Sequence, residues 1–326
     1  MRASYTKDAL SSRNDGPDML LMPEGLSFSA SNTFECGQAF RWTRVRKGDD
    51  DYWIGIVRGY LVKVRRDREF QILAVEKCSK SKEFDLTSYF SLDIDLDSIL
   101  RSLPKESFLD SAIRDYYGLR ILRQDPWECL VSFLCSINCN IPSIRTRIEN
   151  LCRKFGAQIE YRMLDEKYYS FPEPKVLARA EKLELLSCRL GFRWKYVSHV
   201  AKKIVSGELE LESLSKLSYE QACQELISET SGKTFGVGPK VADCVCLFSL
   251  GKLEAFPIDV WMIRCLASNY PSLLEPLRRN VSQLTNNKYQ EWSKAMRSHF
   301  GRYAGYAQQY LYSKTRNSFI PNKGQV

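Results

Sequence analysis

The sequence predicts an α+β fold, in which an N-terminal antiparallel β-sheet domain is followed by a larger, mostly α-helical domain. Residues 52–66 alternate apolar with polar or small side chains, and a charged turn at 67–69 leads into a second apolar run at 70–75. This two-residue period is typical of strands, and two such runs joined by a short turn predict an antiparallel hairpin. From about residue 105 the apolar residues recur every three or four positions, which indicates helices with one buried face.

Capping signals delimit the helices of the second domain. Asp125, Pro126 and Glu128 are the N-cap, first-turn proline and third-position acid of a capping box. Further helices are expected at about 142–155, ending at Gly156, at about 195–206, and at about 218–230, which begins with a capping box from Ser218 to Gln221. We place the domains at residues 1–112 and 113–326, because a chain of 326 residues exceeds the roughly 250–300 residues at which single cores stop growing.

The charge distribution predicts a polyanionic partner. The chain carries 48 Lys and Arg against 39 Asp and Glu, a net charge of +9. Residues 276–326 contain nine Lys or Arg and a single acid, Glu291, so this segment alone carries +8. The expected partner is nucleic acid first and an acidic membrane surface second, and a solvated cationic surface without such a partner is an equally good interpretation of the charge alone.

The composition predicts an intracellular protein without a cofactor. The first 20 residues lack the apolar run of a secretory signal, and no uncharged stretch is long enough for a membrane span. The eleven cysteines fall mostly in apolar helical patterns, where a reducing compartment keeps them as buried thiols. No pair of Cys-x-x-Cys motifs is present, and the Asp93, Asp95, Asp97 triplet lacks the Gly and Glu of a calcium loop, so we expect no metal.

Residues 218–251 carry the most specific pattern, two helices joined by a glycine-containing hairpin. Gly236 and Gly238 permit a tight turn with positive φ and a close approach of the backbone to a ligand, and Pro239 suits the first position of the second helix. The free N–H groups of the hairpin and of the helix start would face an anion such as a DNA phosphate. This is the pattern of a helix-hairpin-helix element, and an ordinary connection between two helices is the alternative.

Lys240 and Asp259 are the candidate catalytic residues. Lys240 is the second residue of the predicted helix, where the helix dipole and partial burial favour the neutral amine that nucleophilic attack requires. Asp259 follows nineteen residues later, in Phe256-Pro257-Ile258-Asp259, as the N-cap of another apolar run. A carboxylate near a substrate sugar can stabilise a developing oxocarbenium charge. Taken singly, Lys240 is more often a phosphate contact and Asp259 more often a cap, but the hairpin, the Lys and the Pro-x-Asp together favour catalysis.

The segments GVGPKVADCVCLF and FPIDVW resemble the helix-hairpin-helix DNA glycosylase superfamily, and residues 24–316 are similar to its 8-oxoguanine DNA glycosylase family. The resemblance implies a bifunctional enzyme of base-excision repair, with glycosylase and β-lyase activities. In it the Lys240 amine attacks C1′ of the extruded 8-oxoguanosine while Asp259 stabilises positive charge on the sugar. A Schiff base then permits strand cleavage without a metal. The implied partner is double-stranded DNA with 8-oxoguanine, preferably opposite cytosine, and we expect a monomer.

Two segments resemble the family's base pocket. In Cys36-Gly37-Gln38-Ala39-Phe40-Arg41-Trp42, the resemblance implies that the carbonyl of Gly37 recognises the N7 hydrogen of the oxidised guanine. Residues 301–312 resemble the C-terminal helix, expected at about 302–314, in which Gln308 contacts the Watson–Crick edge. There Tyr312 stacks on the base, with Cys244 on its opposite face. Because Gln308 and Tyr312 are four residues apart, they lie on one face of that helix.

Three further segments resemble the family's DNA-contacting parts. Residues 125–140 resemble the helix and Asn-rich turn that invade the duplex, with Asn138 pairing to the base left behind. Residues 190–197 resemble the segment that supplies an aromatic wedge, Phe192, and directs Arg193 to the estranged cytosine. In the hairpin, Gly236 and Gly238 are the implied contacts to the DNA backbone.

Three positions depart from the family pattern. Ser143 stands where many relatives have an Arg that contacts the cytosine, so we expect weaker selectivity for the opposite base. Trp261 stands where a His commonly contacts a phosphate, and Cys139 is the middle residue of the Asn turn.

Two other functions stay open. The first is a glycosylase for another lesion, such as an alkylated base or a mismatched adenine, against which Gly37, Gln308 and the Cys244–Tyr312 pair argue. The second is a non-catalytic DNA-binding protein that uses the hairpin as a backbone clamp. Such a clamp has no need for a Lys followed by Pro-x-Asp.

Overall fold

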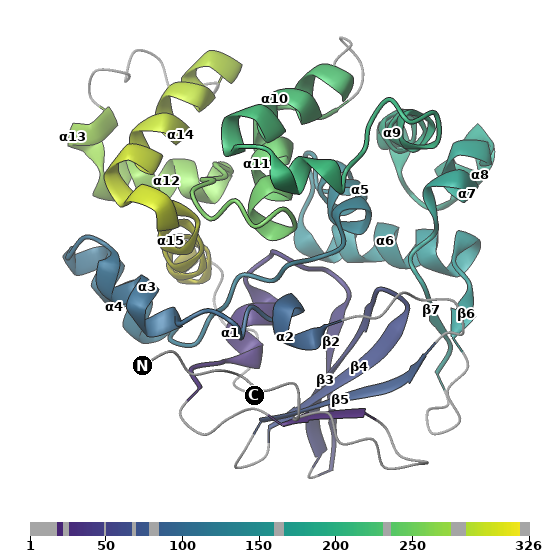
Figure 1. Ribbon diagram of the computed structural model, residues 1–326, viewed down its shortest axis with the longest axis horizontal. Helices are drawn as coiled ribbons and strands as arrows, with labels where there is room; N and C mark the ends of the chain where they lie inside the picture. The colour runs from purple at the N-terminus through teal and green to yellow at the C-terminus, as the bar shows by residue number, and fades with distance from the viewer. Residues whose placement is uncertain are drawn as a thin grey trace.

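Five antiparallel strands form a sheet at the N-terminal side of the chain (Figure 1). The computed structural model describes residues 18–21, 26–48, 50–66, 70–77, 85–159, 166–230, 236–274 and 285–319. The strand order is β1-β5-β4-β3-β2, with bounds β1 Asp18–Leu21, β2 Trp42–Lys47, β3 Asp50–Val57, β4 Tyr60–Arg66 and β5 Phe70–Lys77. The predicted pairing of the strand ending near residue 66 with the run from 70 is confirmed as β4 and β5, while the turn at 67–69 lies outside the described residues.

The prediction of one continuous strand over residues 52–66 is wrong. The chain reverses at Arg58-Gly59, where φ is +50° and +87°, and Val57 pairs with Tyr60 across this two-residue turn. Positive φ at both central residues is what the twist of a tight hairpin requires, and Gly59 adopts it without steric cost. Because the alternation of side chains continues on both sides of such a short turn, the period alone does not reveal it.

Helices make up most of the remaining chain and lie together on one side of the sheet in Figure 1, so the predicted α+β fold is confirmed. Their bounds are α1 Ala30–Glu35, α2 Leu86–Tyr89, α3 Leu96–Ser102, α4 Ser107–Asp115, α5 Pro126–Cys135, α6 Ile141–Phe155, α7 Pro174–Arg179, α8 Lys182–Ser187, α9 Trp194–Val205, α10 Tyr219–Thr230, α11 Pro239–Phe248, α12 Val260–Asn269, α13 Pro271–Leu274, α14 Asn286–Phe300 and α15 Ala304–Phe319. Two short strands, β6 Gln158–Ile159 and β7 Tyr168–Tyr169, pair with each other after α6. In the described residues, no helix is long and apolar enough to cross a membrane.

Of the two predicted capping boxes, one is confirmed in full and the other in part. Before α10, the Ser218 N–H donates to the Gln221 side chain at 3.0 Å and the Gln221 N–H donates to the Ser218 side chain at 3.2 Å, as predicted. At α5 the Asp125 carboxylate accepts the Glu128 N–H at 3.0 Å, but the Glu128 side chain does not complete the box. It accepts instead from Arg41, 3.2 Å away, because a buried guanidinium needs an anionic partner more than the helix start needs a second cap.

Gln38 fixes the segment after α1 to the start of the helical part. Its side chain is fully buried and donates to the carbonyls of Thr33 and Arg120, both at 2.8 Å, and it accepts the N–H of Leu122 at 2.8 Å. Two of these three hydrogen bonds, to Arg120 and from Leu122, therefore join stretches more than 80 residues apart in sequence. Gly37 precedes Gln38, so these hydrogen bonds also fix the backbone of Gly37.

We expect Gln38→Leu to lower the free energy of unfolding by about 2–4 kcal/mol, because it leaves a buried N–H and two buried carbonyls without this partner. The matched control is Gln124→Leu, which removes a single bond, from Gln124 to the Gln38 carbonyl at 2.7 Å. That variant should lose about 1 kcal/mol. Urea unfolding followed by circular dichroism measures both, and equal losses would contradict the role given to Gln38.

Candidate active site

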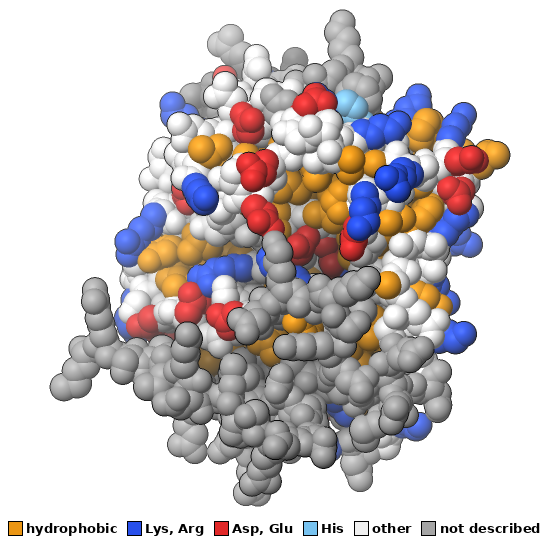
Figure 2. Space-filling view, turned by 45° about the vertical axis from the view of Figure 1, so that its right-hand side comes forward, with side chains coloured by type: hydrophobic (Ala, Val, Ile, Leu, Met, Phe, Trp, Pro, Cys, Tyr) orange, Lys and Arg blue, Asp and Glu red, His pale blue; other side chains and the backbone are white. Residues whose placement is uncertain are grey.

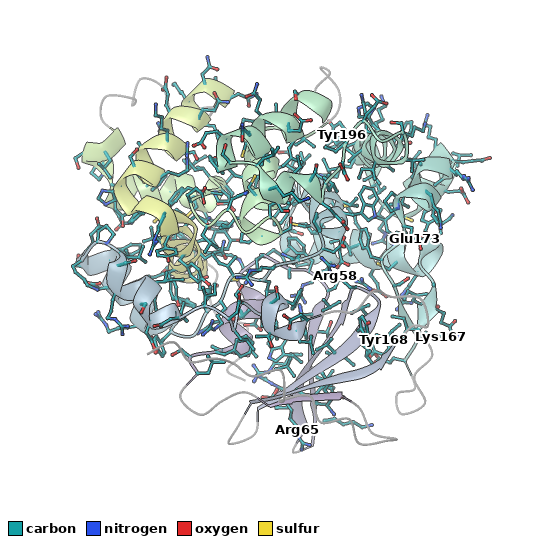
Figure 3. All side chains as sticks on the ribbon, viewed as in Figure 1. Arg58, Arg65, Lys167, Tyr168, Glu173 and Tyr196 are labelled. Atoms are coloured by element: carbon teal, nitrogen blue, oxygen red, sulfur yellow. The ribbon has the colours of Figure 1, made fainter. Side chains whose placement is uncertain are left out.

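Gly236, between α10 and α11, lies where a side chain would not fit. Gly236 has a φ of +83°, and a Cβ there would lie 2.5 Å from Cδ2 of Tyr196. Tyr196, labelled in Figure 3, lies on the side of α9 that faces α10. Gly238, by contrast, has a φ of −94° and is the N-cap of α11, so the expectation of positive φ is confirmed for Gly236 and wrong for Gly238. Thr234 and Phe235 lie outside the described residues.

Lys240 lies in the first turn of α11, against the end of α5. Its Nζ donates to Oγ of Ser136 at 3.4 Å and lies 5.0 Å from the centre of the Phe133 ring. The side chain is half-buried. The amine therefore has one hydroxyl partner and an aromatic face beside it.

Asp259 is the N-cap of α12, as predicted. One carboxylate oxygen accepts the N–H groups of Trp261 and Met262, both at 2.9 Å. Burial raises the pKa of this carboxyl above its usual range, and the backbone N–H groups and the charge of Lys240 work against that rise. Lys240 is thus near enough to act on Asp259 electrostatically, although the two residues start different helices.

Cys244, Tyr312 and Gly37 lie in the same cluster as Lys240 and Asp259. Burial raises the pKa of the Cys244 thiol to about 12, and Lys240, one helical turn away, opposes the rise. Burial and then the charge of Asp259 raise the pKa of Tyr312. Gly37 has a φ of +77°, and a Cβ there would lie 3.0 Å from Oη of Tyr312. The cluster therefore combines α11, α12, α15 and the segment after α1.

Gln308 lies one turn before Tyr312 on α15, at the edge of this cluster. Its side chain is buried, and Nε2 donates to the carbonyl of Pro257 at 3.0 Å while Oε1 accepts from Gln309 at 2.7 Å. An amide has two N–H donors and two lone pairs, so one of each remains for a ligand.

Asn138 and Arg193 form a second group at the turn between α5 and α6. Asn138 is exposed and has a φ of +48°, a conformation that Asn tolerates better than most residues. Arg193 is buried, and its guanidinium donates to the carbonyls of Ile137 at 2.9 Å and Asn138 at 3.2 Å. In this structure the guanidinium fixes the turn, whereas the sequence resemblance implies a contact with a DNA base.

Phe192 projects into solvent beside this turn. Its side chain is 48% exposed, and its ring meets Tyr196 edge-on with centroids 5.8 Å apart. Tyr196 therefore contacts both Phe192 and Gly236 and links the two regions. In Figure 2, which turns the side of α7–α9 forward, hydrophobic side chains reach the surface between Lys and Arg side chains.

The three residues that depart from the family pattern, Ser143, Trp261 and Cys139, each contact a neighbouring side chain. The N–H of Ser143 bonds the Asn140 side chain at 3.0 Å in the first turn of α6. Arg264 lies over the rings of Trp261 and Phe319, at 4.8 and 5.5 Å from their centres. Arg147 donates to the sulfur of Cys139 and, at 2.9 Å, to the carbonyl of Arg189.

Two described cations of the basic C-terminal segment are paired with acids from other helices. Arg297 pairs with Glu220 at 2.9 Å, and Lys314 pairs with Asp115, so both charges are balanced within the protein. Arg316 differs, because its charge acts on Asp259 and Tyr312. Arg278, Arg279 and Lys323 lie outside the described residues.

Ser136, Tyr196 and Arg147 are site-region residues to which the sequence analysis assigned no role. Tyr196 falls inside a quoted motif, but its contact with Gly236 joins positions 40 residues apart in the chain. No local period marks such a pair.

We expect Asp259→Asn to raise the free energy of unfolding at about pH 7. Because burial raises the folded-state pKa of Asp259 above the ordinary 3.8, the ionised carboxylate lowers stability at neutral pH. Asn caps helices equally well. The gain should shrink as the pH falls through the raised pKa and be absent below the ordinary value, which urea unfolding at a series of pH values measures.

Asp95→Asn is the control for this prediction. Asp95 is also an N-cap, of α3, but hydrogen bonds from Ser98 lower its pKa. This variant should therefore be less stable than the wild type at neutral pH, and the difference should vanish in acid. A gain for Asp259→Asn that does not change with pH would contradict the assignment.

Comparisons with known proteins extend the resemblance to the whole chain. The family model of the 8-oxoguanine DNA glycosylase N-terminal domain matches residues 20–130, and that of the HhH-GPD superfamily base excision DNA repair protein matches residues 131–290. The chain is 33% identical over 311 residues to an N-glycosylase/DNA lyase of Saccharomyces cerevisiae, covering 87% of this chain and 82% of that protein. It is 32% identical to an N-glycosylase/DNA lyase of Arabidopsis thaliana, covering 86% and 75%.

A solved structure agrees in fold and in sequence. The Clostridium acetobutylicum 8-oxoguanine glycosylase/lyase, in complex with double-stranded DNA containing cytosine opposite 8-oxoguanine, superposes with a TM-score of 0.79 at 32% identity. The match covers 95% of this chain and 98% of that one. This chain therefore belongs to the 8-oxoguanine DNA glycosylase/lyase family of the helix-hairpin-helix superfamily.

Proposed function

We propose that this protein excises 8-oxoguanine from double-stranded DNA and then nicks the strand, as a bifunctional glycosylase and β-lyase of base-excision repair. The observation that carries the proposal is the single cluster of an amine, a carboxylate, a thiol, an aromatic ring and a glycine with positive φ, contributed by Lys240, Asp259, Cys244, Tyr312 and Gly37. The activity named for the relatives agrees with it.

In this proposal Lys240 is the nucleophile. Its amine forms a bond to C1′ of the extruded nucleotide, and the bond from C1′ to the base breaks. The Asp259 carboxylate stabilises the positive charge that develops on the sugar. Opening of the sugar ring then gives a Schiff base, loss of a C2′ proton follows, and the 3′ phosphate leaves. Ser136 accepts a hydrogen bond from Lys240 and orients the amine.

Base recognition falls to the residues around Tyr312. A base must leave the duplex before its glycosidic bond is accessible, so the enzyme needs a stacking surface and hydrogen bonds to the flipped base. Tyr312 and Cys244 form the two faces of the pocket, the Gly37 carbonyl reads the N7 hydrogen, and Gln308 offers its free N–H and lone pair.

DNA binding uses the second group of residues and the hairpin. Phe192 is the wedge and Asn138 enters the gap, while Arg193 fixes the turn that carries Asn138. The N–H groups near Gly236 and Gly238 bind the backbone, which confers no sequence preference. The site of action is genomic DNA, in the nucleus of a eukaryote or the nucleoid of a prokaryote, and the protein acts as a monomer.

Lys240→Gln should abolish the covalent adduct that borohydride traps on DNA containing 8-oxoguanine, because the amide cannot form a Schiff base. Asp259→Asn should keep DNA affinity but lose most turnover. Gel electrophoresis of borohydride-treated mixtures measures the adduct, and fluorescence anisotropy measures binding. An undiminished adduct with Lys240→Gln would refute the mechanism.

Ser143 predicts weak discrimination among opposite bases. We expect 8-oxoguanine to be excised opposite cytosine, with smaller discrimination against the other three opposite bases than a relative with Arg at this position shows. Ser143→Arg should raise the preference for cytosine roughly tenfold, since a good side chain–base contact contributes about 1–3 kcal/mol of discrimination. Ser143→Ala is the control and should change nothing. A strong cytosine preference that no substitution at this position alters would disprove the role of Ser143.

A further inference from the structure

Asp243 is a buried carboxylate that the proposed mechanism does not use. It lies on α11, three residues after Lys240, and is 2% exposed. It accepts hydrogen bonds from the hydroxyl of Tyr219 on α10, from Tyr289 on α14 at 2.6 Å, and from Ser293 on α14 at 3.3 Å. Burial raises the pKa of the carboxyl while these donors oppose the rise. Burying a carboxylate costs free energy unless hydrogen bonds compensate for the lost hydration, as these donors do. The hydrogen bonds to Asp243 join α10, α11 and α14.

Tyr289 extends this arrangement to the second catalytic residue. Its hydroxyl donates to Oδ2 of Asp243 and accepts the backbone N–H of Ile258 at 3.1 Å. Ile258 immediately precedes Asp259. Two hydrogen bonds therefore connect α11, which carries Lys240, with the residue beside the Asp259 carboxylate.

We propose that Asp243 and Tyr289 are positioning residues that set the placement of Asp259 relative to Lys240. The proposal rests on the function proposed above, in which these two side chains act on one sugar. Asp259 is bonded to the N–H groups of its own helix, which fixes it to α12 but not to α11. The irregular segment from Ser249 to Asp259 separates the two helices, and the hydrogen bonds through Tyr289 connect α11 with the end of this segment.

Tyr is suited to this connection because one hydroxyl both donates and accepts. Donation to a carboxylate polarises the hydroxyl and makes its oxygen a better acceptor for the Ile258 N–H. On the preceding residue, the Pro257 carbonyl accepts from Gln308, so the segment is bonded on both sides before it reaches Asp259. Displacements of about 1 Å between reacting groups reduce rates by up to about a hundredfold, so small losses of order should be measurable.

The test is a double-mutant cycle of single-turnover excision rates on 8-oxoguanine DNA, with wild type, Tyr289→Phe, Asp259→Asn and the double variant. If Tyr289 acts through Asp259, Tyr289→Phe should slow excision on the order of tenfold in the wild-type background. In the Asp259→Asn background it should slow excision less than about twofold. DNA affinity should stay unchanged in both backgrounds.

Tyr270→Phe is the matched control. Tyr270 is as buried as Tyr289, 6% exposed in each case, and its hydroxyl also donates to a carboxylate, Glu106, at 2.7 Å. It should lose similar thermal stability but excise at the wild-type rate. If Tyr289→Phe does not fold, Asp243→Asn replaces it in the same cycle.

Equal slowing in the two backgrounds, or none, would overturn the positioning role while leaving the proposed function intact. If Asp259→Asn excises at the wild-type rate, the proposed mechanism itself fails, and the positioning role fails with it. The positioning role is established if Tyr289→Phe slows excision only when Asp259 is present and Tyr270→Phe leaves the excision rate unchanged.

Discussion

A buried carboxylate close to an amine is the constraint on which the active-site cluster depends. Burial disfavours the ionised form of Asp259, and the two N–H groups at the start of α12 and the charge of Lys240 partly restore it. One oxygen of Asp259 accepts both N–H groups, so the same two hydrogen bonds cap α12 and stabilise the negative charge of the carboxylate. Without these donors a buried carboxyl would take up a proton and lose the charge that the chemistry uses.

The two groups of site residues meet at the end of α5. Ser136 contacts the Lys240 amine and precedes Asn138 by two residues. Arg193 fixes the carbonyls of Ile137 and Asn138 in the same short segment. The turn that the proposed function inserts into the duplex and the amine that attacks the sugar are thus supported by one short, hydrogen-bonded segment of backbone, and such support holds catalytic groups in their productive geometry.

Much of the fold could be predicted because it depends on interactions between near neighbours. The Ser218–Gln221 box and the Asp259 cap join residues two or three positions apart, and both are present. The predictions failed where a distant group or an unseen turn intervened. Glu128 binds Arg41, 87 residues away, instead of capping α5. The strand over 52–66 is broken by a turn that preserves the alternation.

By itself the sequence determined the α+β class, the positions at which several of the helices begin, and which residue types the site contains, because these follow from spacing along the chain and from motifs. Only the tertiary structure decided which of those side chains meet. Tyr312 contacts the Gly37 backbone position, Tyr196 lies between Phe192 and Gly236, and Tyr289 joins Asp243 to Ile258. Each of these contacts connects separate elements through packing distances, and the period of a sequence carries no information about how elements pack.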